Sequence, residues 1–369
     1  MVDRRRIVDL WRQGAANVLV TLARIEGSSY RRAGAHLLIA ANGADYAGAI
    51  SGGCLESEVV RKATWIAEHG AIVKRYSTLF DDTADIPFGL GCGGVVDLLF
   101  EPVETPECQA LLHAMESSLA GAEFRVVTWL PENGTVFARA IFNSAGELIF
   151  ASTSLRPKDL EAARSKPTAN HGVYIEHLIA PQRLFVLGAG DDAKPVVQMA
   201  SLLGWRVFVA EGRPQLVKRE RFPQAERVAI ISSVAELHVR KEDAVVLMTH
   251  SYEQDRTLLA GLLEGPELPG YIGLLGASHR SALLVSEAAA MIGSTVDACC
   301  ERVWAPVGLD LGGDGAEAIA LAVIAEVQSW REGRLGSTRR LTPDRVAEQI
   351  AKGGASRYLR TQCAVGAPE

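Results

Sequence analysis

A short apolar strand, followed at once by a glycine-rich turn and a helix, constrains this chain more than any other feature. The segment Leu184–Ala193 reads LFVLGAGDDA and matches the pattern G-x-G-x-x-A. Gly188 permits the tight turn, Gly190 lets a pyrophosphate approach the backbone, and Ala193 allows the helix to pack closely on the strand. Glu211 ends the next predicted strand, where an acid commonly holds a ribose hydroxyl. The pattern predicts a Rossmann-like domain.

The rest of the second half alternates between strands and helices. Strands are predicted near residues 184–187, 206–210, 227–231, 243–249 and 271–275, with helices near 193–203, 234–239, 256–264, 282–291 and 316–330. This alternation predicts an α/β fold with a doubly wound parallel sheet in a C-terminal domain over residues 181–330. Residues 331–369 are expected to form a mobile tail, with a helix over 343–352.

Residues 1–180 are expected to form a separate N-terminal α+β domain. Helices are predicted over 3–13, 54–68 and 108–119, and strands over 17–26, 36–40, 46–50, 73–77, 95–100, 123–130, 135–142 and 173–179. Asn42-Gly43 predicts a hairpin with a primed turn. Residues 152–170 are polar and contain two prolines.

Two cysteines of the first domain lie among glycines. Gly52 and Gly53 place Cys54 at a predicted helix start, where the helix dipole and free N–H groups favour a thiolate or a phosphate. Cys92 lies in FGLGCGG, a loop that exposes backbone N–H groups and leaves the thiol accessible. A structural thiol normally lies among apolar side chains instead. Together the two motifs favour a functional role, with a cysteine packed at a turn as the alternative.

Two further segments carry candidate binding residues. Arg31 and Arg32 lie in the loop GSSYRRAG, and guanidinium groups suit phosphate or carboxylate oxygens. His250 follows the fourth strand of the predicted sheet, so it points toward any ligand crevice there. For the arginine loop the alternative is a solvated surface loop, and for His250 it is a structural histidine that only donates or accepts hydrogen bonds. We expect the cysteine and arginine loops of the first domain to share a cleft with the second domain. Its side of the cleft would carry Gly188, Gly190, Glu211 and His250.

The ordered set of motifs resembles the XdhC/CoxI family, the xanthine dehydrogenase accessory proteins. The resemblance rests on residues 27–34, 51–56, 89–94, 188–190, 248–250, 271–276 and 305–310, and it covers about residues 10 to 330. Tyr30 and Ala33 replace two prolines that are common in the family loop. Glu211 stands where an aspartate is usual, and Asp191 where many members carry histidine.

The resemblance implies a cytoplasmic accessory chaperone that binds molybdenum cofactor (molybdopterin) and protects it during sulfuration. Such a factor helps to insert the cofactor into a molybdenum hydroxylase of the xanthine dehydrogenase type. Cys54 and Cys92 would then contact molybdenum or relay sulfur, while Arg31, Arg32 and the Gly52-Gly53 helix start would hold the phosphate. We further expect a homodimer and a cysteine desulfurase as a partner.

Two other classes of function also fit the sequence. The glycine fingerprint and Glu211 also fit an NAD(P)-dependent oxidoreductase, with His250 as a candidate for its chemistry. Asp191 and Asp192 oppose it, because they lie where phosphates would bind. A nucleotide-sensing regulatory protein without chemistry is the third possibility. The net charge of −6 argues against a nucleic-acid binder, and no apolar run approaches the roughly 18 residues that span a bilayer.

Overall fold

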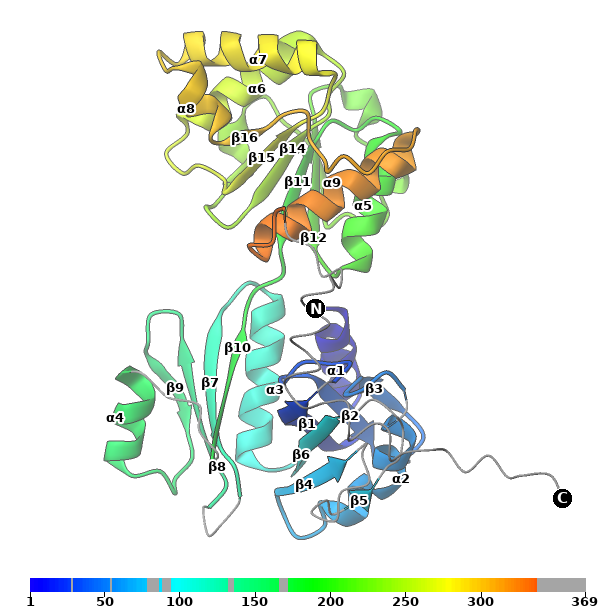
Figure 1. Ribbon diagram of the computed structural model, residues 1–369, viewed down its shortest axis with the longest axis vertical. Coiled ribbons are helices and arrows are strands. Elements are labelled where there is room, and N and C mark those ends of the chain that lie inside the picture. Colours follow the sequence, from blue (N-terminus) through cyan, green and yellow to red (C-terminus); the bar gives the residue numbers. More distant parts are fainter. Residues whose placement is uncertain are drawn as a thin grey trace, which may run out of the picture. The chain divides into compact units, whose positions relative to one another are not determined.

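The computed structural model describes residues 1–27, 29–53, 55–77, 86–87, 94–131, 136–165 and 172–336. The chain divides into two compact units, and the division falls between Ala180 and Pro181. Figure 1 shows the elements of both units. The tail helix predicted over residues 343–352 lies outside the described residues.

The N-terminal unit contains two sheets. The first is mixed, in the order β3-β2-β1-β6-β4-β5, and the second is antiparallel, in the order β10-β7-β8-β9. Its elements are α1 (Val2–Arg12), β1 (Ala16–Gly27), β2 (His36–Ala40), β3 (Tyr46–Gly48), α2 (Glu56–Ile66), β4 (Ile72–Ser77), β5 (Ile86–Pro87), β6 (Gly94–Pro102), α3 (Pro106–Leu119), β7 (Phe124–Trp129), β8 (Ala138–Asn143), β9 (Leu148–Ala151), α4 (Pro157–Ser165) and β10 (Val173–Leu178).

These elements stack in layers, which Figure 1 shows edge-on. Helices α1 and α3 lie between the two sheets, where Leu19 and Leu38 of the first sheet share a core with Leu112 of α3 and Ile141 of the second. Helix α2 covers the outer face of the first sheet, and α4 covers that of the second. Strand β1 alternates between two apolar cores because both faces of its sheet are covered.

Two buried polar bridges join the sheets. Arg139 of β8 donates to both oxygens of Glu101 on β6, at 2.7 and 3.0 Å, and Arg139 is 1% exposed. His36 of β2 pairs through Nε2 with Glu176 of β10 at 3.1 Å. Burial opposes ionisation of Glu176, but His36 and nearby arginines lower its pKa below the usual value. These pairs fix one sheet against the other.

The C-terminal unit has one sheet of six parallel strands, in the order β13-β12-β11-β14-β15-β16. Counted from β11, this is the 3-2-1-4-5-6 order of a Rossmann fold. The elements are β11 (Arg183–Leu187), α5 (Ala193–Leu202), β12 (Arg206–Glu211), β13 (Arg227–Ile230), β14 (Ala244–Leu247), α6 (Tyr252–Glu264), β15 (Tyr271–Leu274), α7 (Ser278–Met291), α8 (Val296–Cys300), β16 (Val303–Trp304) and α9 (Ala316–Arg331).

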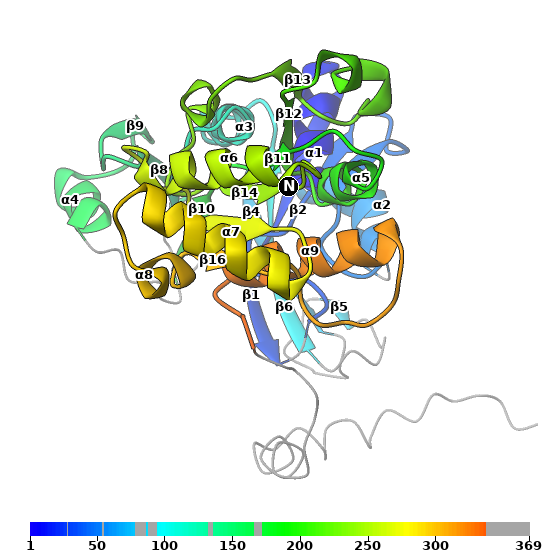
Figure 2. The same ribbon diagram turned by 90° about the horizontal axis from the view of Figure 1, so that it is seen from above.

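Helices cover both faces of this sheet, as a doubly wound fold requires. Helices α5 and α9 pack on one face, and α6 and α7 pack on the other (Figure 2). The predicted fold class is therefore confirmed: an α/β chain whose C-terminal unit is Rossmann-like.

Two local predictions are wrong, and one helix was not predicted. The Asn42-Gly43 turn is not primed, because Asn42 does not have a positive φ; its Oδ1 instead accepts from the Ala44 and Asp45 N–H groups. Residues 157–165, for which no element was predicted, form α4, which turns Ala163 toward the second sheet. The helix expected over 234–239 is only a 3₁₀ turn, Val234–Leu237.

Candidate functional site

The Rossmann crevice brings four predicted residues to one edge of the sheet. Strands β11 and β14 are neighbours at the point where the strand order reverses, and their carboxyl ends lead into Gly188–Gly190 and His250. Ligands of open α/β sheets bind at this point. Glu211 ends β12, the neighbouring strand, and contacts the same turn. The sequence therefore placed Gly188, Gly190, Glu211 and His250 together correctly.

The two glycines are required by close packing. Gly188 has φ of 125°, and a Cβ there would lie 2.3 Å from the Met248 carbonyl oxygen. A Cβ on Gly190 would lie 3.0 Å from His250 Nε2. Gly188 thus permits the turn, as predicted, and the His250 ring lies against the backbone of Gly190.

Glu211 is engaged within the protein. Its Oε2 accepts from the Ala189 N–H at 3.1 Å and from Arg213 Nη2 at 2.9 Å, while Oε1 accepts from the Arg213 N–H and Nε. Burial opposes ionisation, but these hydrogen bonds lower the pKa of Glu211 below its usual value. Glu211 therefore braces the glycine turn as a carboxylate, and its predicted contact with a ribose stays a prediction.

Each acid of the pair after the glycine turn contacts another side chain of the same unit. Asp191 is exposed and pairs with Lys194 at 2.6 Å and Arg221 at 2.9 Å, which lowers its pKa. Asp192 contacts His250 Nε2 at 3.1 Å. Lys194 and Arg221 reduce the repulsion between Asp191 and an incoming phosphate, but the Asp192 carboxylate remains beside Gly190.

His250 adopts a left-handed backbone conformation, with φ of 59°. A non-glycine residue seldom does so, and such residues gather at functional sites. The preceding Thr249 donates its hydroxyl to buried Asp255 at 2.6 Å, and Arg280 pairs with the same carboxylate at 2.7 Å. This network holds the turn after β14. Sequence reasoning missed Asp255 and Arg213, because only the folded structure brings them to the crevice.

In the N-terminal unit, two predicted loops meet. The exposed ring of Tyr30 lies on Gly52, 3.4 Å from the place that a Cβ would occupy. Arg31 pairs with Asp3 of α1 at 2.5 Å. Arg32 is exposed, and its guanidinium forms no ion pair with the residues that the structure describes. Among the described residues, the Arg32 guanidinium therefore has no carboxylate partner.

Glu56 organises the second loop, and its role was not predicted from the sequence. Its Oε1 accepts from the Ile50 and Ser51 N–H groups at 3.1 and 2.7 Å, and its Oε2 accepts from the Gly53 N–H at 3.0 Å and from the Ser51 hydroxyl. Burial opposes ionisation, but the hydrogen bonds lower the pKa of Glu56. The Gly53 N–H predicted to bind a phosphate thus already has a carboxylate partner.

Cys54 and Cys92 lie outside the described residues, so their predicted roles stay predictions. Among the described cysteines, Cys108 and Cys299 are buried and Cys300 is exposed. Burial raises the pKa of the Cys108 thiol well above its usual value, which makes it unreactive. Within the described ranges, no group of three or more His, Cys, Asp or Glu residues is placed to hold a metal ion.

Comparison of the sequence with family models assigns the chain to a family. A family model described as the XdhC and CoxI family matches residues 10–77, and one described as the XdhC Rossmann domain matches residues 184–327. The chain belongs to the XdhC and CoxI family. The predicted resemblance is confirmed, and it spans both units.

Three relatives illustrate the likeness of this XdhC/CoxI-family chain. A Bacillus subtilis protein named as a probable xanthine dehydrogenase subunit is 27% identical over 327 residues, which are 85% of this chain and 93% of that protein. The crystal structure of a protein described as a xanthine dehydrogenase from Bacillus halodurans has a TM-score of 0.76 at 27% identity, covering 94% of this chain and 99% of that one. The uncharacterized Escherichia coli protein YqeB is 28% identical over 188 residues, 47% of this chain and 34% of its own length.

A search of the described helices for a bilayer-spanning segment finds none of sufficient length and apolar character.

Proposed function

We propose that this chain is an accessory chaperone that binds molybdenum cofactor, supports its sulfuration and inserts it into a molybdenum hydroxylase of the xanthine dehydrogenase type. Family membership supports the class of partner, since relatives carry xanthine dehydrogenase names. The observation that carries the proposal is the junction of Tyr30 with Gly52, which joins the arginine loop to the loop that ends at Gly53, directly before Cys54.

The residues at this junction fit one end of the cofactor. A phosphate requires a cation or N–H donors, and the exposed guanidinium of Arg32 is available, whereas the Gly53 N–H is engaged by Glu56. We therefore assign the phosphate to Arg32, with Arg31 supporting the loop through Asp3. When bound, the cofactor supplies the molybdenum centre and its exchangeable sulfur.

The thiols of Cys54 and Cys92 are proposed to hold the metal end or to relay sulfur. A soft thiolate suits molybdenum and sulfur exchange, whereas a serine hydroxyl does not. A cysteine desulfurase as the sulfur source, a cytoplasmic location and a homodimer belong to the same proposal.

The test is the amount of pterin that co-purifies with variants from cells that make the cofactor. We expect Arg32→Gln to lower the pterin recovered per mole of protein several-fold, because the phosphate loses its guanidinium. Arg6→Gln is the matched control, since Arg6 is an exposed arginine of the same unit, outside both loops. Cys54→Ser and Cys92→Ser should impair pterin retention or the sulfuration of the hydroxylase. Unchanged retention by Arg32→Gln would remove its assignment, and normal hydroxylase maturation by both serine variants would remove the thiol role.

An NAD(P)-dependent oxidoreductase is the second candidate. The Rossmann strand order and the Gly188 turn favour it. Two contacts weigh against it: Glu211 is already paired with Arg213, and Asp192 lies beside Gly190. We rank it below the accessory role.

A further inference from the structure

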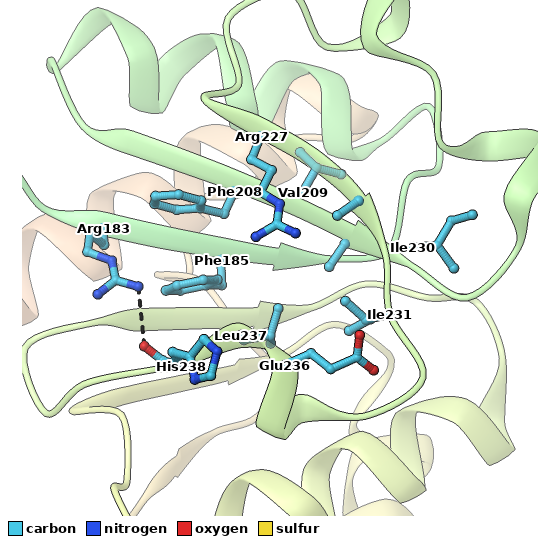
Figure 3. A pocket seen from close by; sticks show the side chains of 12 residues that line it. Arg183, Phe185, Phe208, Val209, Arg227, Ile230, Ile231, Glu236, Leu237 and His238 are labelled. Atoms are coloured by element: carbon cyan, nitrogen blue, oxygen red, sulfur yellow. Dashed lines mark hydrogen bonds between the residues drawn. The ribbon is translucent and has the colours of Figure 1, made fainter.

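One face of the Rossmann sheet is left partly uncovered near its edge strand. The connection from β13 to β14 forms only the 3₁₀ turn Val234–Leu237, whereas α6 and α7 cover the same face further along the sheet. Between this turn and strands β11–β13 lies a hollow of about 220 Å³, which Figure 3 shows from close by. The hollow exists because a short turn stands where a full helix would pack.

The register of the strands gives the hollow an aromatic wall and a floor of small side chains. Phe185, Phe208 and Arg227 are aligned across β11, β12 and β13. The two phenylalanine rings stack at 4.9 Å between centroids, with 19° between their planes. Two residues further along the strands, Ala210 pairs with Ala229, and both line the hollow. The alanine methyl groups leave room beside the stacked rings.

The cations at the hollow differ in how they are engaged. Arg183 lies over Phe185 and donates to the His238 carbonyl at 3.3 Å, and its other nitrogen is 3.4 Å from Asp243. Arg227 is exposed, and in the part of the chain that the structure describes it has no carboxylate partner. Figure 3 shows its guanidinium directed over the hollow. The Arg227 guanidinium is therefore placed to form an ion pair with an anionic group of a ligand.

The opposite end of the hollow carries a carboxylate. Glu236 Oε1 accepts from the Ser232 and Ser233 N–H groups at 2.9 and 3.0 Å, which fixes the side chain at the start of the 3₁₀ turn. Ile231 and Leu237 complete the apolar lining between the two charges. A ligand with its anionic group at Arg227 and an apolar body toward Leu237 matches this distribution.

We propose that this hollow binds a small planar aromatic acid of one or two rings, a ligand that the accessory role does not assign. A planar ring over Ala210 and Ala229 contacts the edges of the Phe185 and Phe208 rings, and aromatic pairs gain energy beyond their buried area. Its carboxylate or phosphate pairs with Arg227. The volume is below the roughly 300–1,000 Å³ of sites for drug-sized ligands, which limits the ligand to one or two rings.

The test uses 2-naphthoate as the probe, with its neutral analogue 2-naphthamide and the flexible acid octanoate, in saturation-transfer NMR titrations of the full chain. We expect 2-naphthoate to bind about fivefold more tightly than 2-naphthamide, because one exposed charge-assisted contact is gained. Octanoate should bind more weakly than 2-naphthoate, since it has no aromatic ring to contact the two phenylalanines.

Variants of the residues that line the hollow test whether the probes bind there. Ala229→Leu fills the hollow and should abolish binding of both naphthyl probes, whereas Arg227→Gln should make the acid and the amide bind equally. Arg302→Gln and Ala298→Leu, at exposed positions of the same unit outside the hollow, should change neither Kd. Thermal melting of each variant checks that it is folded. Absence of 2-naphthoate binding, or binding that Ala229→Leu leaves unchanged, would overturn the proposal. Equal binding of octanoate would overturn the aromatic specificity.

Discussion

Replacing Glu56 with Gln should loosen the glycine loop before Cys54 while the rest of the N-terminal unit stays folded. The carboxylate accepts three backbone N–H groups and one hydroxyl, and Glu56 is only 5% exposed. A glutamine amide presents one oxygen and one NH₂ group. The NH₂ group cannot accept from the Gly53 N–H and the Ser51 hydroxyl, so two of the four hydrogen bonds are lost.

The size of the effect follows from these bonds. A hydrogen bond accepted by a charged group contributes about 1.5–3 kcal/mol. The free energy of local opening of residues 50–53 should fall by that amount, which corresponds to amide exchange faster by about tenfold to a hundredfold. Because the folded pKa of Glu56 lies below its unfolded value, its stabilisation is present above the unfolded pKa and is lost as the pH falls through the folded pKa.

The assay is hydrogen–deuterium exchange by mass spectrometry on the peptides that contain residues 50–53. Glu58→Gln is the matched control, because Glu58 lies in the same first turn of α2 but pairs with the side chains of Arg61 and Lys62. It should leave loop exchange unchanged. Exchange in Glu56→Gln that equals the wild type would refute the claim that this carboxylate holds the loop.

Three other outcomes follow from the structure. Glu101→Gln should lower the free energy of unfolding in urea by about 3–5 kcal/mol, because it leaves the buried Arg139 charge uncompensated, and Glu101→Leu combined with Arg139→Met should recover most of the loss. Gly188→Ala should lower the melting temperature strongly, since its Cβ would meet the Met248 carbonyl at 2.3 Å, whereas Gly293→Ala, with open space around it, should cost only about 1 kcal/mol of backbone strain. Calorimetry with NAD(H) and NADP(H) should detect only weak binding, because the two acids after the glycine turn oppose phosphates; micromolar or tighter binding would promote the oxidoreductase.

The Rossmann unit could be predicted because its signals are local. A buried strand, the glycine turn and the following helix are contiguous from Leu184 to Leu202, and Glu211 follows one strand later. The crevice residues then meet because parallel strands bring their carboxyl ends to one edge. The partners of Glu211 could not be predicted, since the bond to Ala189 depends on how β12 packs beside the turn.

The N-terminal unit was predicted less completely because its order depends on distant pairs. Arg139 and Glu101 are 38 residues apart, and His36 and Glu176 are 140 apart, so no local pattern joins them. Helix α4 was missed because Ala163 is its one fully buried residue and gives no apolar period. The role of Glu56 could have been predicted from the sequence. It is an acid at the start of the helix, two residues after Cys54 and five after Ser51, whose hydroxyl it binds.

The cleft predicted from the sequence between the two domains stays a prediction, as do the roles of Cys54 and Cys92.

The most direct test of the accessory role is mass spectrometry of the small molecule that remains bound to the full chain after purification from cells that make molybdenum cofactor. The accessory role predicts a pterin mass with its phosphate, reduced in Arg32→Gln and unchanged in Arg6→Gln. A nicotinamide dinucleotide in its place, or no pterin above the level of an unrelated Rossmann protein purified alongside, would contradict it.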